Sequence, residues 1–252
     1  MQLIRPLLLV SLLLAAQAGW AGTFSQIGSS RWVTATKIYD GDTFRTDAGE
    51  KVRLLGINTP ETAHNDNPGQ PLARKAREEL KNLIQGEVVR LEFDRDQHDV
   101  YGRLLTHVYL RDGTWVNARM IEKGMAHCYT FAPNFRHAAE LLIKERQARD
   151  KRRGIWKTSR FGMLKSAHVD KSHVGQFRVI SGKVGIIDKK GWSFRLGNLS
   201  VSIPESYRQW FRAPPVLKSG DFVAAHGKIR ISNRGRLYLA LHSPYDLEIM
   251  ER

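Results

Sequence analysis

The chain has 252 residues, of which 42% are apolar and 9% aromatic, and this composition excludes wholesale disorder. Forty lysines and arginines stand against 25 acidic residues, which gives a formal net charge of +15. Such an excess favours a polyanionic partner, either nucleic acid or an anionic membrane surface. A basic protein selected only for solubility is the alternative that composition leaves open.

The N-terminal segment 1–21 is typical of a secretory signal peptide. Arg5 supplies positive charge, an apolar run follows over 7–16, and small residues at 16–21 offer a cleavage site. The run is well short of the roughly 20 residues that a spanning helix needs, which favours cleavage over a membrane anchor. We therefore expect a periplasmic or secreted protein with no membrane attachment after signal cleavage.

Cys128 is the single cysteine, so no intrachain disulfide can form and the core must stabilise the fold. The sequence favours a small buried apolar role for Cys128 over a reactive thiol. The nine histidines show no HExxH or Cys/His pattern with zinc spacing, so zinc is not expected.

The first half of the chain reads as strands interrupted by three helices. Apolar runs and alternation predict strands at 31–39, 43–47, 50–57, 87–94 and 103–110. Start and stop signals predict helices at 71–85, 116–123 and 134–152, the last with Asn134 as its N-cap. This order indicates an α+β, mainly β, fold: a small five-stranded barrel with helices packed on one side.

The second half is separated by residues 157–175, which have no sustained apolar period and are predicted to be a linker. Further strands are expected at 176–187, 191–197, 199–203, 222–231, 235–241 and 245–249. A short helical piece near 204–212 interrupts them. Short strands with one interposed helix fit a second, partly open barrel of the OB type over 176–250.

Two short segments carry the most chemistry: Arg53-Leu-Leu-Gly-Ile-Asn-Thr-Pro-Glu61 and Asp99-Val-Tyr-Gly-Arg103. Together with Asp42 they offer two arginines, oxygen ligands for a hard cation, and a carboxylate that can act as a base. A phosphodiester hydrolase needs this inventory, because a metal polarises the phosphoryl oxygen and guanidiniums stabilise the developing charge. Taken singly, Arg53 can be a snorkelling surface residue and Arg103 can simply follow a turn.

Four motifs in order make the pattern specific: Tyr39-Asp-Gly-Asp-Thr43, Arg53 to Thr62, Asp99 to Arg103, and Asn117 to Gly124. Over about residues 31–156 the chain resembles the thermonuclease (staphylococcal nuclease-like) family. The resemblance implies an OB-type five-stranded barrel with three helices. It also implies a calcium-dependent phosphodiesterase that cuts DNA and RNA and leaves 3′-phosphate ends.

Carried over by motif, the resemblance assigns Arg53, Glu61 and Arg103 to catalysis. It assigns Asp42, position 58 and the Thr59 carbonyl to calcium. The chemistry agrees, because arginine presents a planar fork to phosphate oxygens and calcium accepts oxygen ligands together with water. Asp40, next to the calcium aspartate, is interpreted first as a turn residue, with a supporting role at the metal as the alternative.

Two positions depart from the family pattern. Asn58 stands where the family usually has an aspartate, so the predicted calcium site keeps an amide oxygen but loses one negative charge. Val100 stands where some members carry a basic residue that touches a terminal phosphate, which removes that contact.

Three aromatic residues are candidates for substrate binding: Tyr101, Tyr129 and Phe131. The last two lie where the family uses tyrosines to hold base and phosphate, and Phe131 lacks the hydroxyl. Aromatic faces stack on unpaired bases without sequence preference, which favours single strands. Packing in the core is the alternative for all three rings.

The second half resembles, more distantly, the OB-like tail found after thermonuclease domains. Basic residues, aromatics and turns alternate at 189–195 and 228–236, which suits a surface running along a phosphate backbone. We therefore expect a nucleic-acid-binding module with DNA and RNA as partners, the alternative being a purely structural barrel. For the whole chain, the rivals to a nuclease are a non-catalytic nucleic-acid-binding protein on this fold and a surface protein that binds anionic polymers or membranes.

Overall fold

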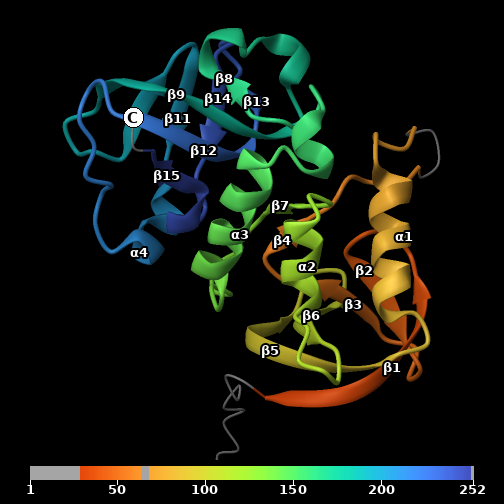
Figure 1. Cartoon of the computed structure of the whole chain (residues 1–252). Coiled ribbons are helices and arrows are strands. Elements are labelled where there is room, and N and C mark those ends of the chain that lie inside the picture. The colour runs from red at the N-terminus through yellow and green to blue at the C-terminus, as the bar shows by residue number, and fades with distance from the viewer. Residues whose placement is uncertain (1–28, 64–67, 251–252) are drawn as a thin grey trace, which may run out of the picture.

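The computed structural model describes residues 29–63 and 68–250, so the predicted signal peptide lies outside the described residues. Two β-sheets form the bulk of the molecule, with helix α3 between them (Figure 1). Among the described residues, no helix is both long enough and apolar enough to cross a membrane.

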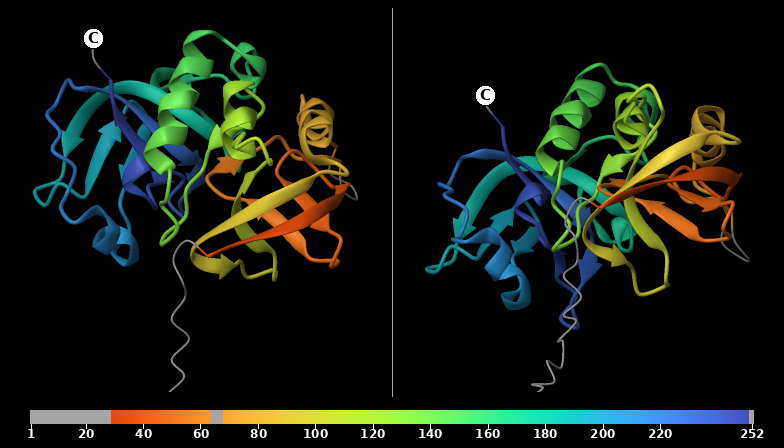
Figure 2. Two further views of the ribbon diagram at one scale, coloured as in Figure 1. Left: turned by 60° about the horizontal axis from the view of Figure 1, so that its bottom comes forward. Right: turned by 90° about the horizontal axis from the view of Figure 1, so that it is seen from below.

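The first sheet is a closed five-stranded barrel in the order β1-β2-β3-β6-β5. The strands are β1 Ser30–Ile38, β2 Thr43–Thr46, β3 Lys51–Leu54, β5 Val88–His98 and β6 Leu104–Tyr109. Strands β1 and β5 run antiparallel side by side (Figure 2), and β3 and β6 form the parallel pair. In β3, Val52 and Leu54 point into the core while Arg53 between them is partly exposed, as strand alternation requires. The predicted five-stranded barrel is confirmed.

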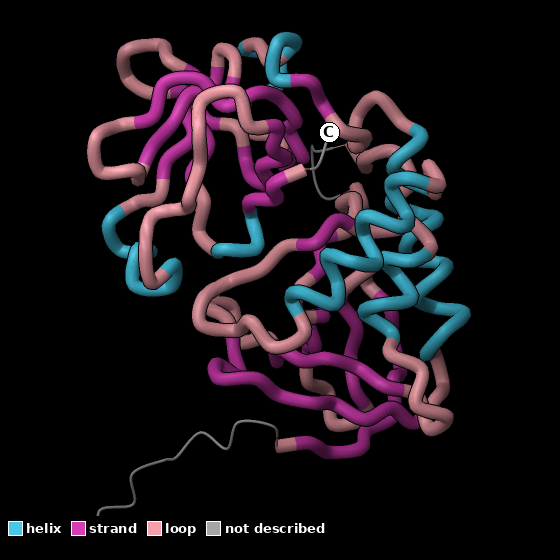
Figure 3. Tube along the Cα trace, turned by 60° about the vertical axis from the view of Figure 1, so that its left-hand side comes forward, coloured by secondary structure: helices cyan, strands magenta, loops and turns pink. Residues whose placement is uncertain are grey.

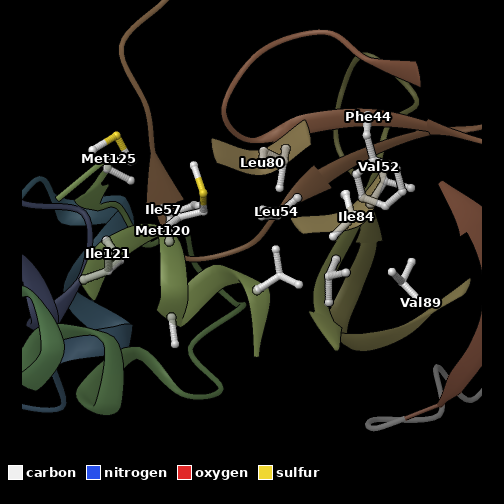
Figure 4. Packing of buried hydrophobic residues seen from close by; sticks show 14 of the residues in the cluster. Phe44, Val52, Leu54, Ile57, Leu80, Ile84, Val89, Met120, Ile121 and Met125 are labelled. Carbon is white, nitrogen blue, oxygen red and sulfur yellow. The ribbon is translucent and has the colours of Figure 1, made fainter. Parts of the chain in front are cut away.

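Helices α1 Ala73–Ile84, α2 Val116–Glu122 and α3 Ala138–Asp150 gather on one side of the barrel (Figure 3). The buried positions of α1 recur every three or four residues, at Ala73, Ala76, Leu80 and Ile84. The last three join Met120 and Ile121 of α2 and the inward residues of the strands in one apolar core, part of which Figure 4 shows.

Asn117, in the fourth motif, ties α2 to the barrel. Its side chain accepts a hydrogen bond from the Val108 amide at 2.9 Å and donates to the Leu55 carbonyl at 2.9 Å. Asn117 is fully buried, and its bond to Leu55 fixes the second motif where the chain leaves β3.

Helix α3 begins at Ala138, four residues later than the sequence predicted, so Asn134 is not its N-cap. The Asn134 side chain accepts a hydrogen bond from the Asp96 amide and donates to the Asp96 carbonyl, both at 2.8 Å. The Asn134 side chain is therefore bonded to the Asp96 backbone instead of capping α3, and these bonds hold the loop before α3 against β5.

A two-residue strand pair, β4 Ile57–Asn58 with β7 His127–Cys128, was not predicted. The pairing sets Asn58 opposite His127, and the Tyr129 amide donates to the Gly56 carbonyl at 2.9 Å. Cys128 is buried, as predicted, and burial together with the charge of Glu145 raises the pKa of its thiol well above the usual range.

The second sheet is strongly curled and follows the order β13-β14-β11-β10-β9-β12-β15, with β8 paired to β9. Its strands are β8 Leu164–Lys165, β9 Phe177–Ile187, β10 Ser193–Leu196, β11 Leu199–Ser202, β12 Phe222–Lys228, β13 Arg230–Ile231, β14 Leu237–Ala240 and β15 Leu247–Ile249. A short helix, α4 Arg208–Phe211, interrupts them as expected. The curled sheet confirms the predicted second, partly open barrel-like unit.

Residues 157–175, predicted to be a linker, are part of the folded body. They contribute β8 and two 3-10 turns, and Phe161 and Val169 are buried. Phe161 packs with Trp156 and with Val179 and Ala224 of the second sheet. This small apolar cluster fills the junction between α3 and the sheet, so the absence of an apolar period here reflects irregular backbone rather than exposure.

Candidate functional site

One pocket of about 560 Å³ opens on the barrel wall, and it collects eight of the nine residues singled out by the sequence. Those eight are Asp42, Arg53, Asn58, Glu61, Tyr101, Arg103, Tyr129 and Phe131. The ninth, Thr59, lines an adjoining smaller pocket. Segments far apart in the sequence thus meet at one place.

Asp42 lies in the turn between β1 and β2 and is held by the second motif. One carboxylate oxygen accepts hydrogen bonds from both the amide and the hydroxyl of Thr59, each at 2.9 Å. The preceding Gly41 allows this approach, since a Cβ there would lie 2.8 Å from Thr59 Cγ2. Asp42 is only 4% exposed, so its orientation is fixed before any ligand binds.

Asp40 lies at the same turn and faces the same pocket. Its Oδ1 accepts the Asp42 amide at 2.9 Å, and burial together with the charge of Asp42 raises the pKa of Asp40 to about 7. Two carboxylates packed this closely repel each other unless a proton or a cation lies nearby. Asp40 therefore belongs to the candidate site as well as to the turn, a part that the sequence interpretation ranked second.

Arg53 projects from β3 toward these carboxylates. Its Nη1 forms an ion pair with Asp42 at 3.0 Å and donates to the Leu54 carbonyl at 3.0 Å. Its Nη2 donates to Asn58 Oδ1 at 3.4 Å, a long hydrogen bond. The guanidinium is thus oriented beside the oxygen donors rather than snorkelling to solvent.

Arg103 comes from the tight turn before β6, with Gly102 at φ +76° to close it. Asp99 orients Arg103, because its carboxylate accepts the Arg103 Nε at 2.7 Å and the Arg103 amide at 2.9 Å. The guanidinium lies 5.5 Å from the centre of the Tyr101 ring. Tyr101 is 81% exposed, which excludes the alternative that its ring packs in the core.

Glu61 lies on an exposed loop at the rim of the pocket. Gln70 anchors this loop, since its side-chain oxygen accepts the Glu61 amide at 3.1 Å and its own amide donates to the Glu61 carbonyl at 2.9 Å. An exposed carboxylate on an anchored backbone can contact both solvent water and a ligand in the pocket.

Tyr129 and Phe131 reach the pocket because β7 pairs with β4. Their ring centres lie 4.3 Å apart in an edge-to-face arrangement, and Phe131 is 48% exposed. Both rings line the pocket, and the exposure of Phe131 argues against a purely internal packing role for it.

The side chains and backbone here suit a hard cation. Asp40, Asp42 and Asn58 offer oxygen atoms to the pocket, and calcium prefers oxygen ligands from carboxylates, amides and water. Burial, together with the charge of Asp42, raises the pKa of Asp40, and a cation bound between the two carboxyls would favour the ionised form of both. The residues present therefore fit calcium, with Asp42, Asn58 and the Thr59 carbonyl as its candidate ligands.

Sequence reasoning placed no residue of the second half of the chain beside this site, although Lys228 begins the segment 228–236 that was predicted to contact nucleic acid. Arg160, Gly175, Phe177 and Lys228 line the smaller pocket beside Asn58, Glu61 and Tyr129. Arg160, Gly175 and Phe177 lie in or next to the segment predicted to be a linker, and no local pattern singled them out.

A family model described as "Staphylococcal nuclease homologue" matches residues 51–158. The thermonuclease of Staphylococcus intermedius is 34% identical over 123 residues, which cover 48% of this chain and 73% of that protein. The thermonuclease of Staphylococcus hyicus is 30% identical over 143 residues, covering 54% and 84%. Endonuclease YncB of Bacillus subtilis is 34% identical over 132 residues, covering 50% and 62%.

These relatives match about half of this chain and most of each thermonuclease, and the matched family region holds Arg53, Asn58, Glu61 and Arg103. The closed five-stranded barrel agrees with the sequence match. This chain belongs to the staphylococcal nuclease family.

Proposed function

We propose that this protein is an exported, calcium-dependent nuclease that cleaves phosphodiester bonds in DNA and RNA and leaves 3′-phosphate ends. The observation that carries the proposal is the convergence of two oriented arginines and a rim carboxylate on the pocket that holds the oxygen donors. Relatives named thermonuclease or endonuclease support nuclease activity.

The roles follow from position. Calcium, when bound, supplies Lewis-acid polarisation of the scissile phosphate. Arg53 and Arg103 would bind the phosphoryl oxygens from two sides, and Glu61 would accept a proton from the attacking water at the rim. Asp42 and Asn58 would hold the cation beside Arg53.

Single strands are the preferred substrate in this proposal. The exposed rings of Tyr101 and Phe131 flank the pocket and can stack on splayed bases, which a duplex does not offer. The charge excess of the chain and the basic hairpins of the second sheet would hold the remaining strand. The signal-like segment 1–21 supports export.

The direct test is digestion of single-stranded DNA by the wild-type protein with calcium and with a calcium chelator. Cleavage should proceed in calcium and fall to background in chelator, because the phosphoryl charge then lacks its cation. The lengths of the DNA fragments on a gel measure cleavage in calcium and in chelator. Equal cutting in chelator would exclude the calcium role, and DNA binding without cleavage in calcium would favour the non-catalytic binding protein.

Asn58→Asp should tighten calcium binding by about tenfold, since it restores a charged ligand a few ångströms from the cation. Isothermal titration calorimetry measures the dissociation constant. Asn82→Asp, an equal charge change on the exposed face of α1, is the matched control and should leave that constant unchanged. An Asn58→Asp protein with wild-type calcium affinity would show that Asn58 is not a ligand.

A further inference from the structure

A second pocket, of about 230 Å³, lies directly beside the candidate active pocket. The two share Asn58, Glu61 and Tyr129 as lining residues. The far side of the second pocket is built by Arg160, Gly175, Phe177 and Lys228. All four lie beyond residue 158, where the family match ends, so this wall belongs to the part of the chain that the family model does not cover.

An aromatic surface connects the two pockets. Tyr129 lies between Phe131 on the catalytic side, at 4.3 Å between ring centres, and Phe177 on the other side, at 5.1 Å. His127 continues the contact at 5.6 Å from Phe177 and stays neutral near pH 7, because burial lowers its pKa to about 3. Three rings in contact make a platform of the kind on which successive bases of a single strand stack.

The far wall of the second pocket carries two basic residues, Arg160 and Lys228. Arg160 Nη1 is buried and has no hydrogen-bond partner among the described residues, and burial lowers the Arg160 pKa. Arg178 lies near Arg160, and burial together with the charge of Arg160 lowers the Arg178 pKa to about 10. No ion pair within residues 29–63 and 68–250 involves Arg160, Arg178 or Lys228.

A buried N–H without an acceptor, as at Arg160 Nη1, is costly, and an anion that accepts its hydrogen bond relieves the cost. The Arg160 guanidinium lies over the Phe161 ring at 4.8 Å, which holds it in place at the pocket wall. Lys228 ends β12 with an exposed side chain and adds a second cation on the same wall. Two cations beside an aromatic platform match the pattern of a nucleic-acid backbone with its bases.

We propose that this second pocket binds a backbone phosphate of the same strand that is cut in the neighbouring pocket. Arg160 and Lys228 contact that phosphate, and Phe177 stacks on the base that follows the bases at Tyr129 and Phe131. The inference rests on the proposed nuclease function and assigns the second half of the chain a direct share in substrate binding. Strands long enough to fill both pockets therefore bind more tightly than strands that fill one.

The test compares wild type with Arg160→Gln, Lys228→Ala and the double variant. One substrate is a dithymidylate, and the other is an oligothymidylate of about twelve nucleotides, within the site sizes known for such grooves. The measured quantity is the kcat/KM for the long substrate divided by that for the short one. The double variant should lower this ratio by about tenfold, the effect of losing a charge-assisted phosphate contact.

Lys183→Ala is the matched control. Lys183 is exposed on the same strand pair, six residues along β9 from Phe177 and roughly 20 Å away in an extended strand, and it lines neither pocket. It should keep the wild-type ratio. A ratio unchanged in the double variant, or an equal loss on both substrates, would overturn the second pocket and leave the nuclease function standing.

Binding of the long oligothymidylate in chelator, followed by fluorescence anisotropy, tests the pocket without cleavage. The slope of log affinity against log salt should decrease in magnitude by about 0.7 for each phosphate contact removed from a single strand. If wild type cleaves neither substrate in calcium, the proposed function fails, and this slope still decides the pocket. Equal slopes for wild type and the double variant would exclude it.

Discussion

Glu61→Gln should lower the rate of single-stranded DNA cleavage by about a hundredfold to ten-thousandfold, the range for loss of a general base. Glutamine keeps the shape of the side chain and leaves the backbone bonds between positions 61 and 70 intact. It removes the carboxylate that would accept the proton of the attacking water. Single-turnover cleavage with saturating calcium measures the step, and anisotropy in chelator measures DNA binding separately.

Glu87→Gln is the matched control, because Glu87 is exposed between α1 and β5 and lines neither pocket. It should cleave at the wild-type rate. A Glu61→Gln protein that also cleaves at that rate would remove Glu61 from the mechanism and shift the search for a base to Asp40, which faces the same pocket. If Glu61→Gln lost DNA binding and cleavage to the same extent, Glu61 would instead act in binding the DNA.

The sequence predicts much of the site because the positions of Arg53 and Arg103 depend on residues close to them in the chain. The alternation of β3 places Arg53 on the outside of the barrel between two buried residues, and the turn of the Asp99 motif aims Arg103. Both consequences follow from strand period and turn chemistry. The barrel itself follows from short strands with regular breaks, which the apolar pattern reveals.

What the sequence did not predict depends on contacts between distant segments. Tyr129 faces the pocket because a two-residue strand pairs with β4, and two residues are too few to show a period. Asn134 has the chemistry of an N-cap, but the Asp96 backbone claims its side chain. Arg160 lines the second pocket because Phe161, next to it, is buried at a junction that no local pattern encodes.

Glu248→Gln should lower the free energy of unfolding by about 3 kcal/mol or more, the usual cost of removing one partner from a buried ion pair. Glu248, on β15, is 3% exposed and lies against α3. It accepts a bidentate pair from Arg149 at 3.2 and 3.3 Å, Arg146 Nε at 2.6 Å and His226 Nε2 at 2.8 Å. Glutamine cannot balance these positive charges.

The effect should reach both halves of the molecule, because the cluster joins them. His226, on β12, also faces Glu145 of α3, with 3.6 Å between Nδ1 and Oε2, and both side chains are buried. Glu145 in turn accepts the Cys128 amide of β7 at 2.7 Å. Denaturant unfolding followed by tryptophan fluorescence measures the change. Glu205→Gln, on an exposed turn of the second half, is the control and should unfold like wild type.

The pKa shifts in this cluster predict how the stability loss in Glu248→Gln depends on pH. Burial alone would raise the pKa of Glu248, but the hydrogen bonds from His226 and Arg149 outweigh burial and lower that pKa. The stabilisation that Glu248 contributes is therefore present above the unfolded pKa of about 4.3 and is lost on acidification. Burial alone would lower the pKa of His226, but the charges of Glu145 and Glu248 outweigh burial and raise that pKa. The stabilisation that His226 contributes is therefore fully present below the unfolded pKa of about 6.5 and is lost as pH rises.

The stability difference between wild type and Glu248→Gln should therefore be greatest near pH 5–6, between those two values, and smaller on either side. Asp246, next to the cluster, has a pKa raised to about 7 by burial, and the pKa of buried Glu145 is also raised. Because these two carboxyls ionise at lower pH in the unfolded chain than in the folded protein, they lower the stability of both proteins together as pH rises above about 4. A difference that stays constant from pH 4 to 8 would mean that Glu248 contributes through packing rather than through its charge.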